Sequence, residues 1–506
     1  MHELDKVIKM IEGGQLVPAL DRLSSILEEH PDAAWALAIR GRLFMDLREY
    51  ASLEENAARF RRLQPSNPVA ISQSAAAALF RQDIAKATEL VLEALTESGQ
   101  SVDSFVLDVS SLLSYALAGN GIPLTARVYA TLPMVSSGYE DQRLAADVLR
   151  QLNSDPQINL LAKSVPALVP RPTDATWGER YDEAAMLLAS NKVVLAETKF
   201  DSLQRVAPMQ PEVLSGLLNC AIWRGDHEKQ AELLTKLSQC DELELDDRAR
   251  YLAMASTVSP EANQLTLKQF SLEAEFDSID EPNQALLSSS RFASLPPETL
   301  TQLKSEDGVL PKSAFQLLDR DALTDGVEAT SENVPTAMAL VLVHGKQTDR
   351  AARVEVLGLA EPHRDAVIAL LNDVVSEQDW KPDDVGVIPL ESFVTPQIAG
   401  VPAGGLEMDS LESLQRDLLR SRGIEILLNS PIPLLGDATL AGSARNDAKS
   451  LGVAAVLRYL ECESSLTASA PELLPKLFES LGLSPPPEPA PTSEELEDIP
   501  NDELNR

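Results

Sequence analysis

Cysteine is scarce in this sequence of 506 residues, with only three copies. Cys220, Cys240 and Cys462 lie far apart, are odd in number and form no Cys-x-x-Cys pair. This pattern argues against a disulfide framework and against a zinc knuckle, and it suits a reducing compartment.

Basic residues are also few, because 43 lysines and arginines stand against 78 aspartates and glutamates, giving a net charge of −35. Phosphate backbones and anionic lipids repel such a chain, so we expect neither a nucleic acid nor a membrane as its partner. Acidity also keeps an extended protein in solution, and this general role explains most of the charge.

Long hydrophobic runs are absent. No stretch approaches the roughly 18 apolar residues that would span a bilayer. The N-terminal sequence MHELDKVIKM carries charge throughout and lacks the apolar segment of a signal peptide. The sequence therefore predicts a cytoplasmic protein.

Aromatic residues make up only 4% of the chain, although 44% of it is hydrophobic. A core built mainly from alanine and leucine suits packed helices better than β-sandwiches. Composition thus favours a mainly α fold.

Histidine is rare as well, and the five copies show no pair at the spacing of helical metal ligands. Such scattered residues also support no serine–histidine–aspartate set. We therefore expect no metal, no cofactor and no catalysis.

What the sequence does contain is a repeat in its N-terminal part. Ala19, Leu53 and Ala87 follow one another at an even interval, and Pro31 and Pro65 are separated by the same interval. A fixed period of about 34 residues is typical of stacked helix–turn–helix units, each of which buries its apolar faces only against its neighbours.

These residues resemble the tetratricopeptide repeat (TPR) family, and the chain is similar to a bacterial-type member with degenerate repeats. Leu53 and Phe60 stand where alanine is usual, and Arg48 and Gln82 replace the glycine between paired helices. The resemblance implies an α-solenoid of helical hairpins that acts as a scaffold for a protein or peptide partner. An ordinary array of helical hairpins remains the alternative.

Breaks in the pattern divide the chain into segments. The run 165–172 holds several prolines, which forbid a continuous helix. The tail is acidic and proline-rich, so it cannot offset its chain entropy by burial. The predicted segments are a TPR-like block at 1–164, a second TPR-like block at 173–259, an irregular helical region at 260–335, a small α/β insert at 336–400, a C-terminal helical module at 405–483 and a disordered tail at 484–506.

The insert at 336–400 reads as a β-hairpin, because two short apolar runs, 336–343 and 354–357, flank a polar turn. A helix at 363–376 and a strand at 385–394 follow. The turn sequence Gly345-Lys346-Gln347-Thr348 lacks the first glycine of a phosphate-binding loop. We therefore expect a hairpin turn there and no nucleotide site.

The resemblance also implies where a partner binds, since the first helix of each TPR pair lines a groove. Arg42 is a cation at such a position and could hold a carboxylate with two hydrogen bonds. The alternative is that these side chains only pack between repeats. The expected groove residues are Trp35, Ile39, Arg42, Met45, Ser72, Gln73, Tyr181, Asn219 and Trp223.

A second function class comes from the C-terminal module. Its segment 431–436, followed by a helix at about 448–461, is similar to the toxin-binding domain of certain bacterial antitoxins. Thr439-Leu440 stands in place of the usual Thr-Pro. This resemblance implies a regulatory partner protein that binds through 405–483.

Overall fold

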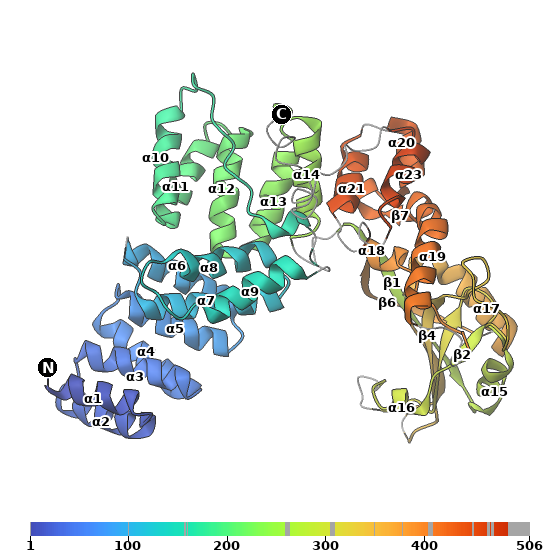
Figure 1. Cartoon of the computed structure of the whole chain (residues 1–506), viewed down its shortest axis with the longest axis horizontal. Coiled ribbons are helices and arrows are strands. Elements are labelled where there is room, and N and C mark those ends of the chain that lie inside the picture. Colours follow the sequence, from blue (N-terminus) through green and yellow to red (C-terminus); the bar gives the residue numbers. More distant parts are fainter. Residues whose placement is uncertain are drawn as a thin grey trace, which may run out of the picture. The chain divides into compact units, whose positions relative to one another are not determined.

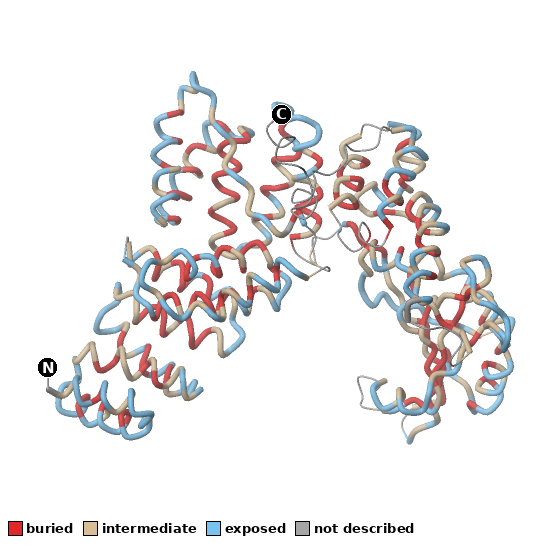
Figure 2. The backbone as a smooth tube through the Cα atoms, viewed as in Figure 1, coloured by how far each residue is buried: buried red, intermediate tan, exposed pale blue. Residues whose placement is uncertain are grey.

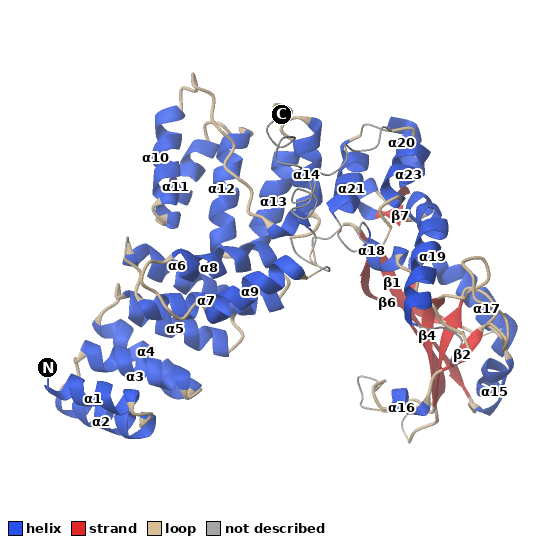
Figure 3. Cartoon of the chain, viewed as in Figure 1, coloured by secondary structure: helices blue, strands red, loops and turns tan. Residues whose placement is uncertain are grey.

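The computed structural model describes residues 2–483 except 100, 156–157, 159, 259–263, 304–308, 349, 377, 403–407, 448–449, 463–465 and 467–469. The tail expected at 484–506 lies outside these residues. The chain forms two compact units, Met1–Leu265 with Ala454–Ser464, and Thr266–Val453 with Ser465–Arg506. Unit 1 is built from helices, and the six-stranded sheet belongs to unit 2 (Figure 3).

The first block of unit 1 is a TPR-like stack of helical hairpins, as the repeat period of the sequence predicts (Figure 1). The second helices of three consecutive pairs begin at Leu16, Tyr50 and Ile84, which are evenly spaced at that period. The helices are α1 (His2–Glu12), α2 (Leu16–Glu29), α3 (Ala34–Asp46), α4 (Tyr50–Leu63), α5 (Pro68–Phe80), α6 (Ile84–Ser98), α7 (Ser104–Gly119), α8 (Pro123–Val135) and α9 (Arg143–Ser154).

The turns inside these hairpins explain two departures from the TPR pattern. Gly14, Arg48 and Gln82 recur at the same interval and adopt φ angles of 72°, 58° and 62°. A left-handed backbone favours glycine, and other residues adopt it at a steric cost. Arg48 and Gln82 therefore keep the geometry of the turn without its usual residue.

Small residues let helices of successive hairpins approach. A Cβ atom added at Gly41 of α3 would lie 2.1 Å from the side chain of Gln73 on α5. In the second block, a Cβ added at Gly216 would lie 2.5 Å from the ring of Phe200. Figure 2 shows buried positions along the helices of both blocks, which agrees with cores formed between neighbouring helices.

The second block repeats the hairpin pattern within unit 1. Its second helices α11 and α13 begin at Val193 and His227, which are separated by the same period as in the first block. Residues 454–462 of α21 also belong to unit 1, where Arg458 pairs with Asp246. The elements are η1 (Leu160–Lys163), α10 (Gly178–Ala189), α11 (Val193–Gln204), α12 (Pro211–Arg224), α13 (His227–Ser238), α14 (Leu245–Ala255) and α21 (Leu451–Cys462).

The second block docks on α6 and α8 of the first. The Tyr129 hydroxyl donates a hydrogen bond to the Trp223 carbonyl, and the two rings meet edge to face with centroids 5.9 Å apart. The Gln230 amide donates to the Thr125 hydroxyl at 3.1 Å. These contacts join α8 to the end of α12 and to α13.

Unit 2 contains an antiparallel sheet in the order β2-β3-β4-β5-β1-β6. Helices α15 and α17 cover one face, where a core forms around Leu286, Phe315 and Leu371. The elements are β1 (Thr266–Phe276), α15 (Asp280–Ser288), β2 (Phe292–Ser294), α16 (Pro297–Leu300), β3 (Ser313–Leu318), β4 (Ala337–His344), β5 (Ala352–Ala360), η2 (Glu361–His363), α17 (Arg364–Val375), β6 (Lys381–Pro389) and α18 (Leu390–Val394).

The expectation of an irregular helical region at 260–335 is wrong, because β1, β2 and β3 lie there. The sequence of β1, TLKQFSLEAEF, is rich in helix-forming residues, but it pairs with β5 and β6 on its two sides. Such tertiary pairing overrides local propensity. The insert expected at 336–400 is consequently part of one larger sheet.

The β4–β5 hairpin and α17 confirm two expectations for the insert. The strand expected at 385–394 is displaced: β6 ends at Pro389, and α18 begins at Leu390.

The helical module expected at 405–483 is divided between the units, since 454–464 belong to unit 1. A Cβ at Gly423 of α19 would meet the side chain of Leu473 on α23 at 3.4 Å. The glycine therefore lies at a helix contact. Besides α21, the elements are α19 (Met408–Asn429), β7 (Pro431–Ile432), η3 (Pro433–Leu435), β8 (Ala438–Thr439), α20 (Leu440–Asp447) and α23 (Leu473–Ser480).

The close contact at Gly216 yields a test of the hairpin packing. Gly216→Ala should lower the free energy of unfolding of unit 1 by about 1–3 kcal/mol, because the new methyl group overlaps the Phe200 ring. Gly119→Ala is the matched control, since a Cβ there meets nothing within 4 Å. It should leave stability unchanged or raise it by up to about 1 kcal/mol. Urea unfolding measures both, and equal effects would contradict the packing.

Candidate functional site

Arg42, expected as a cation open to a ligand, is already paired. Its guanidinium contacts the carboxylate of Asp108 on α7 and lies 5.3 Å from the centroid of the Phe105 ring. The Tyr139 hydroxyl donates to the other oxygen of Asp108 at 2.5 Å. Burial and the hydrogen bond to Asp108 raise the pKa of Tyr139, so this hydroxyl stays a neutral donor.

The Arg42–Asp108 pair joins α3 to α7, and α5 lies in contact with both helices. The chain itself therefore supplies a carboxylate to this cation. The geometry therefore gives no support to a carboxylate site at Arg42.

Five other expected groove residues of the first block pack between helices. Trp35, Ile39 and Met45 are half-buried and lie against the apolar cores. Ser72 and Gln73 are fully buried, so the expectation that they line a groove is wrong. These positions follow the alternative, packing between repeats.

Gln73 shows why burial is favoured at its position. Its amide nitrogen donates to the carbonyls of Leu37 and Ala38 at 3.2 and 3.1 Å, and its oxygen accepts from Asn56 at 2.8 Å. Asn56 in turn donates to the Leu37 carbonyl at 2.8 Å. The polar groups of Gln73 are thus satisfied within the stack, which removes the penalty of burying them.

The second block holds an extended segment, residues 165–172, which we call the strap. It runs beside α12 before the chain reaches α10 (Figure 1). Val169 donates its backbone N–H to the Ser215 hydroxyl at 3.0 Å, and its carbonyl accepts from the Tyr181 hydroxyl at 3.0 Å. The Asn219 amide donates to the Pro166 carbonyl at 3.3 Å. Side chains of α10 and α12 therefore bind the strap through its backbone.

One side-chain pair completes the strap contacts. Arg171 donates two hydrogen bonds to the carboxylate of Asp182 on α10, at 2.8 and 2.7 Å. The Arg171 hydrogen bond lowers the pKa of Asp182. We call Tyr181, Asp182, Ser215 and Asn219 the strap site.

The structure thus brings together two of the expected residues, Tyr181 and Asn219, on an extended segment of the chain itself. Trp223 lies apart from them, at the junction with Tyr129, and lines a cavity of about 560 Å³. The proline pattern of 165–172 predicts a boundary between repeat blocks and not a bound segment. Its signal was present, because closely spaced prolines favour an extended backbone.

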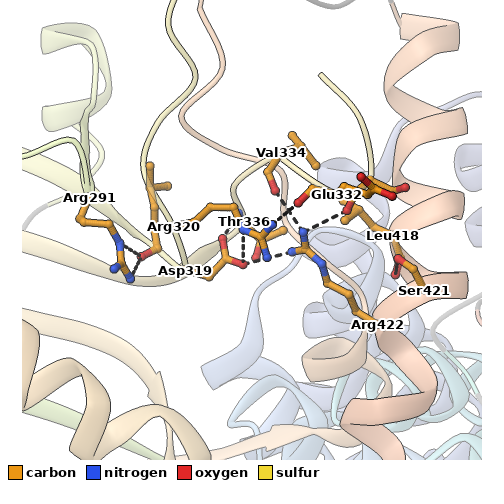
Figure 4. Close-up of polar contacts among 11 residues, drawn as sticks. Arg291, Asp319, Arg320, Glu332, Val334, Thr336, Leu418, Ser421 and Arg422 are labelled. Atoms are coloured by element: carbon orange, nitrogen blue, oxygen red, sulfur yellow. Dashed lines mark hydrogen bonds and ion pairs between the residues drawn. The ribbon is translucent and has the colours of Figure 1, made fainter. Parts of the chain in front are cut away.

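In unit 2, a cavity of about 490 Å³ lies between the sheet and α18 and α19. Asp319 and Arg422 are among the residues that line it, and Figure 4 shows their polar contacts. Arg422 contacts the Asp319 carboxylate at 3.1 Å and the Ser331 carbonyl at 3.1 Å, while Asp319 also accepts from the Thr336 backbone N–H at 2.7 Å. Because protein groups occupy this guanidinium, we interpret the pair as a fastening of α19.

A buried ionic group lies at the other end of β4 and β5. Arg353 has no exposed surface, and its Nε donates to the Glu355 carboxylate. The Nε2 atom of His344 lies 3.3 Å from the same carboxylate. Burial alone would raise the pKa of Glu355, but the contacts with His344 and Arg353 outweigh burial and lower it to about 2.

Among the described residues, no group of three or more histidine, cysteine, aspartate or glutamate residues could hold a metal ion. None of the described helices is both long enough and apolar enough to cross a membrane.

Comparison with known proteins gives little. No family model and no curated protein matches the chain. The solved structure of YrrB, described as a TPR protein with an unusual peptide-binding site, is 14% identical, with 44% of this chain and 92% of that chain covered and a TM-score of 0.19. The structure of Naa15/Naa10 bound to HypK-THB is 12% identical, with a TM-score of 0.21; the match covers 95% of this chain but 58% of that one.

Unit 1 is TPR-like in its own helices, which are evenly spaced along the chain and have small residues at helix contacts.

The buried ionic group predicts an acid-dependent stability of unit 2. The pKa of Glu355 lies below its ordinary value of 4.5, so its contribution is present above pH 4.5 and is lost as the pH falls toward 2. Glu355→Gln should lower the free energy of unfolding by up to about 3 kcal/mol at neutral pH, because it leaves the buried Arg353 with Glu273, 3.5 Å from its Nε atom, as its remaining charge partner. The difference between variant and wild type should shrink between pH 4.5 and 2.

Trp380 lies in the core of unit 2. With Trp35, Trp177 and Trp223 replaced by phenylalanine in both wild type and variant, tryptophan fluorescence during urea unfolding reports on unit 2. Glu275→Gln, an exposed position on β1, serves as the control and should have little effect at any pH. A difference for Glu355→Gln that stays constant with pH would contradict the lowered pKa.

Proposed function

We propose that the chain is a protein-interaction scaffold, and that its second repeat block binds an extended peptide segment of a partner at the strap site. The observation that supports this proposal is the strap itself. Ser215, Asn219 and Tyr181 hold an extended segment in the way that a repeat protein holds a peptide.

The chemistry of the strap site favours exchange of one extended segment for another. Three of its four side chains bind backbone atoms, so they recognise the extended shape and not a particular sequence. The Arg171–Asp182 pair is exposed to solvent, and exposed ion pairs contribute little to stability. A partner segment with a basic residue opposite Asp182 could make the same contacts.

The strap also sets the affinity that a partner segment needs in order to bind at the strap site. A segment tethered beside its own site has an effective concentration in the millimolar range, so a partner must bind more tightly than the strap. As part of the same proposal, the scaffold acts in the cytoplasm and binds without catalysis or a cofactor. Binding through 405–483 is less favoured, because these residues do not form one unit.

The proposal is tested with a fluorescent peptide of the strap sequence, SVPALVPRP, added to the full chain. Val169→Pro removes the N–H group that donates to Ser215 and should release the strap. The variant should bind the peptide at least about tenfold more tightly than wild type, because a tenfold change equals the roughly 1.4 kcal/mol of one lost hydrogen bond. Fluorescence anisotropy measures the affinity.

Two further variants control this experiment. Ala167→Pro adds a proline to the strap at an exposed residue and should bind the peptide like wild type. Ser215→Ala with Asn219→Ala, introduced beside Val169→Pro, should abolish the gain. The strap would be a purely structural linker if Val169→Pro bound no peptide. The same conclusion would follow if Val169→Pro and Ala167→Pro bound the peptide with equal affinity.

A further inference from the structure

The first block has a pocket lined by arginines, apart from the groove positions discussed above. The pocket lies between α3 and α4 and has a volume of about 460 Å³. We call it the basic pocket, and its polar lining consists of Arg40, Ser52, Glu55, Asn56, Arg59 and Arg62.

The charges of the basic pocket are not balanced. Three arginines face one carboxylate, in a chain whose net charge is −35. Within the described part of the chain, none of these three arginines forms an ion pair. Neighbouring arginines of the same block do, since Arg61 pairs with Glu93 and Arg81 with Glu54.

Two of the three arginines are also held in place. Arg40 donates from Nε to Asn56 at 2.8 Å, and Asn56 is itself fixed by the Leu37 carbonyl. Arg59 donates to the Pro31 carbonyl at 2.7 Å. Burial and the neighbouring charge of Arg59 lower the pKa of Arg40, which is the expected effect of cations that stand together without an anion.

We propose that the basic pocket binds a dianionic phosphate monoester group. Its excess of two positive charges matches a phosphate dianion, and guanidinium groups bind phosphate oxygens through paired hydrogen bonds. The Ser52 hydroxyl donates to the Glu49 carboxylate at 3.3 Å, so the guanidinium groups are the donors for the phosphate. Arg62 is exposed and forms no ion pair within the described chain. The volume leaves room for the group that carries the phosphate.

The phosphate could be carried by a free small molecule or by a phosphorylated side chain of a partner. Both supply the same chemistry to the pocket. The site is distinct from the strap site, which lies in the second block, so this inference does not depend on the proposed function.

Isothermal titration of the full chain with inorganic phosphate at low salt and pH 7.5 tests the proposal. Wild type should bind phosphate, and Arg62→Gln should weaken binding about tenfold while leaving the fold intact, because this exposed side chain holds no other contact. Glu55→Gln should tighten binding about threefold, since it removes the one negative charge of the pocket.

Arg61→Gln is the matched control, because it removes the same charge from the adjacent residue, which pairs with Glu93 outside the pocket. It should leave phosphate affinity unchanged. Absence of phosphate binding by wild type would overturn the proposal, and so would equal losses for Arg61→Gln and Arg62→Gln, which would indicate general electrostatics.

A second titration distinguishes the two sources of phosphate. A phosphoserine peptide that binds more tightly than inorganic phosphate supports a phosphorylated partner, and equal affinities support a free phosphate ester. In both cases binding should fall below about pH 6, where the phosphate loses its second charge. An affinity that does not change with pH would overturn the proposal that the pocket binds the dianionic form of the phosphate.

Discussion

The first repeat block depends on one close approach, that of α3 to α5 at Gly41. Only a residue without a side chain leaves room for Gln73, whose amide then bonds Leu37 and Ala38 on α3 and Asn56 on α4. Asn56 in turn orients Arg40. The absence of a side chain at Gly41 therefore permits a hydrogen-bond network that links α3, α4 and α5. The same network holds the Arg40 guanidinium in the basic pocket.

The two blocks use the same hairpin geometry but fill their surfaces differently. In the first block, Arg42 and Asp108 form an ion pair that spans α3 to α7. In the second, the strap takes up the donors of Tyr181 and Asn219. Polar groups at these two places are thus satisfied within the chain, and a partner that binds at the strap site must replace contacts that already exist.

The repeat period predicted the hairpins because it reflects a geometric requirement: each hairpin must present the same face to the next hairpin in the stack. The sheet of unit 2 escaped prediction in its first half, since β1 gains its stability from pairing with distant strands. Site residues were harder still. Gln73 and Tyr181 both occupy first helices, but their surroundings, a buried amide network and a strap, are not encoded in their positions within the repeat.

The contrast between Arg42 and Arg62 shows what decides whether a cation can bind a ligand. Arg42 lies where TPR proteins place ligand-binding residues, but the nearby Asp108 and the ring of Phe105 engage it. Arg62 lies on a second helix, where the repeat pattern indicates no function, and it stands beside two other arginines. Three arginines that share one carboxylate keep an excess of positive charge, so an external anion gains more beside them than beside a cation that is already paired.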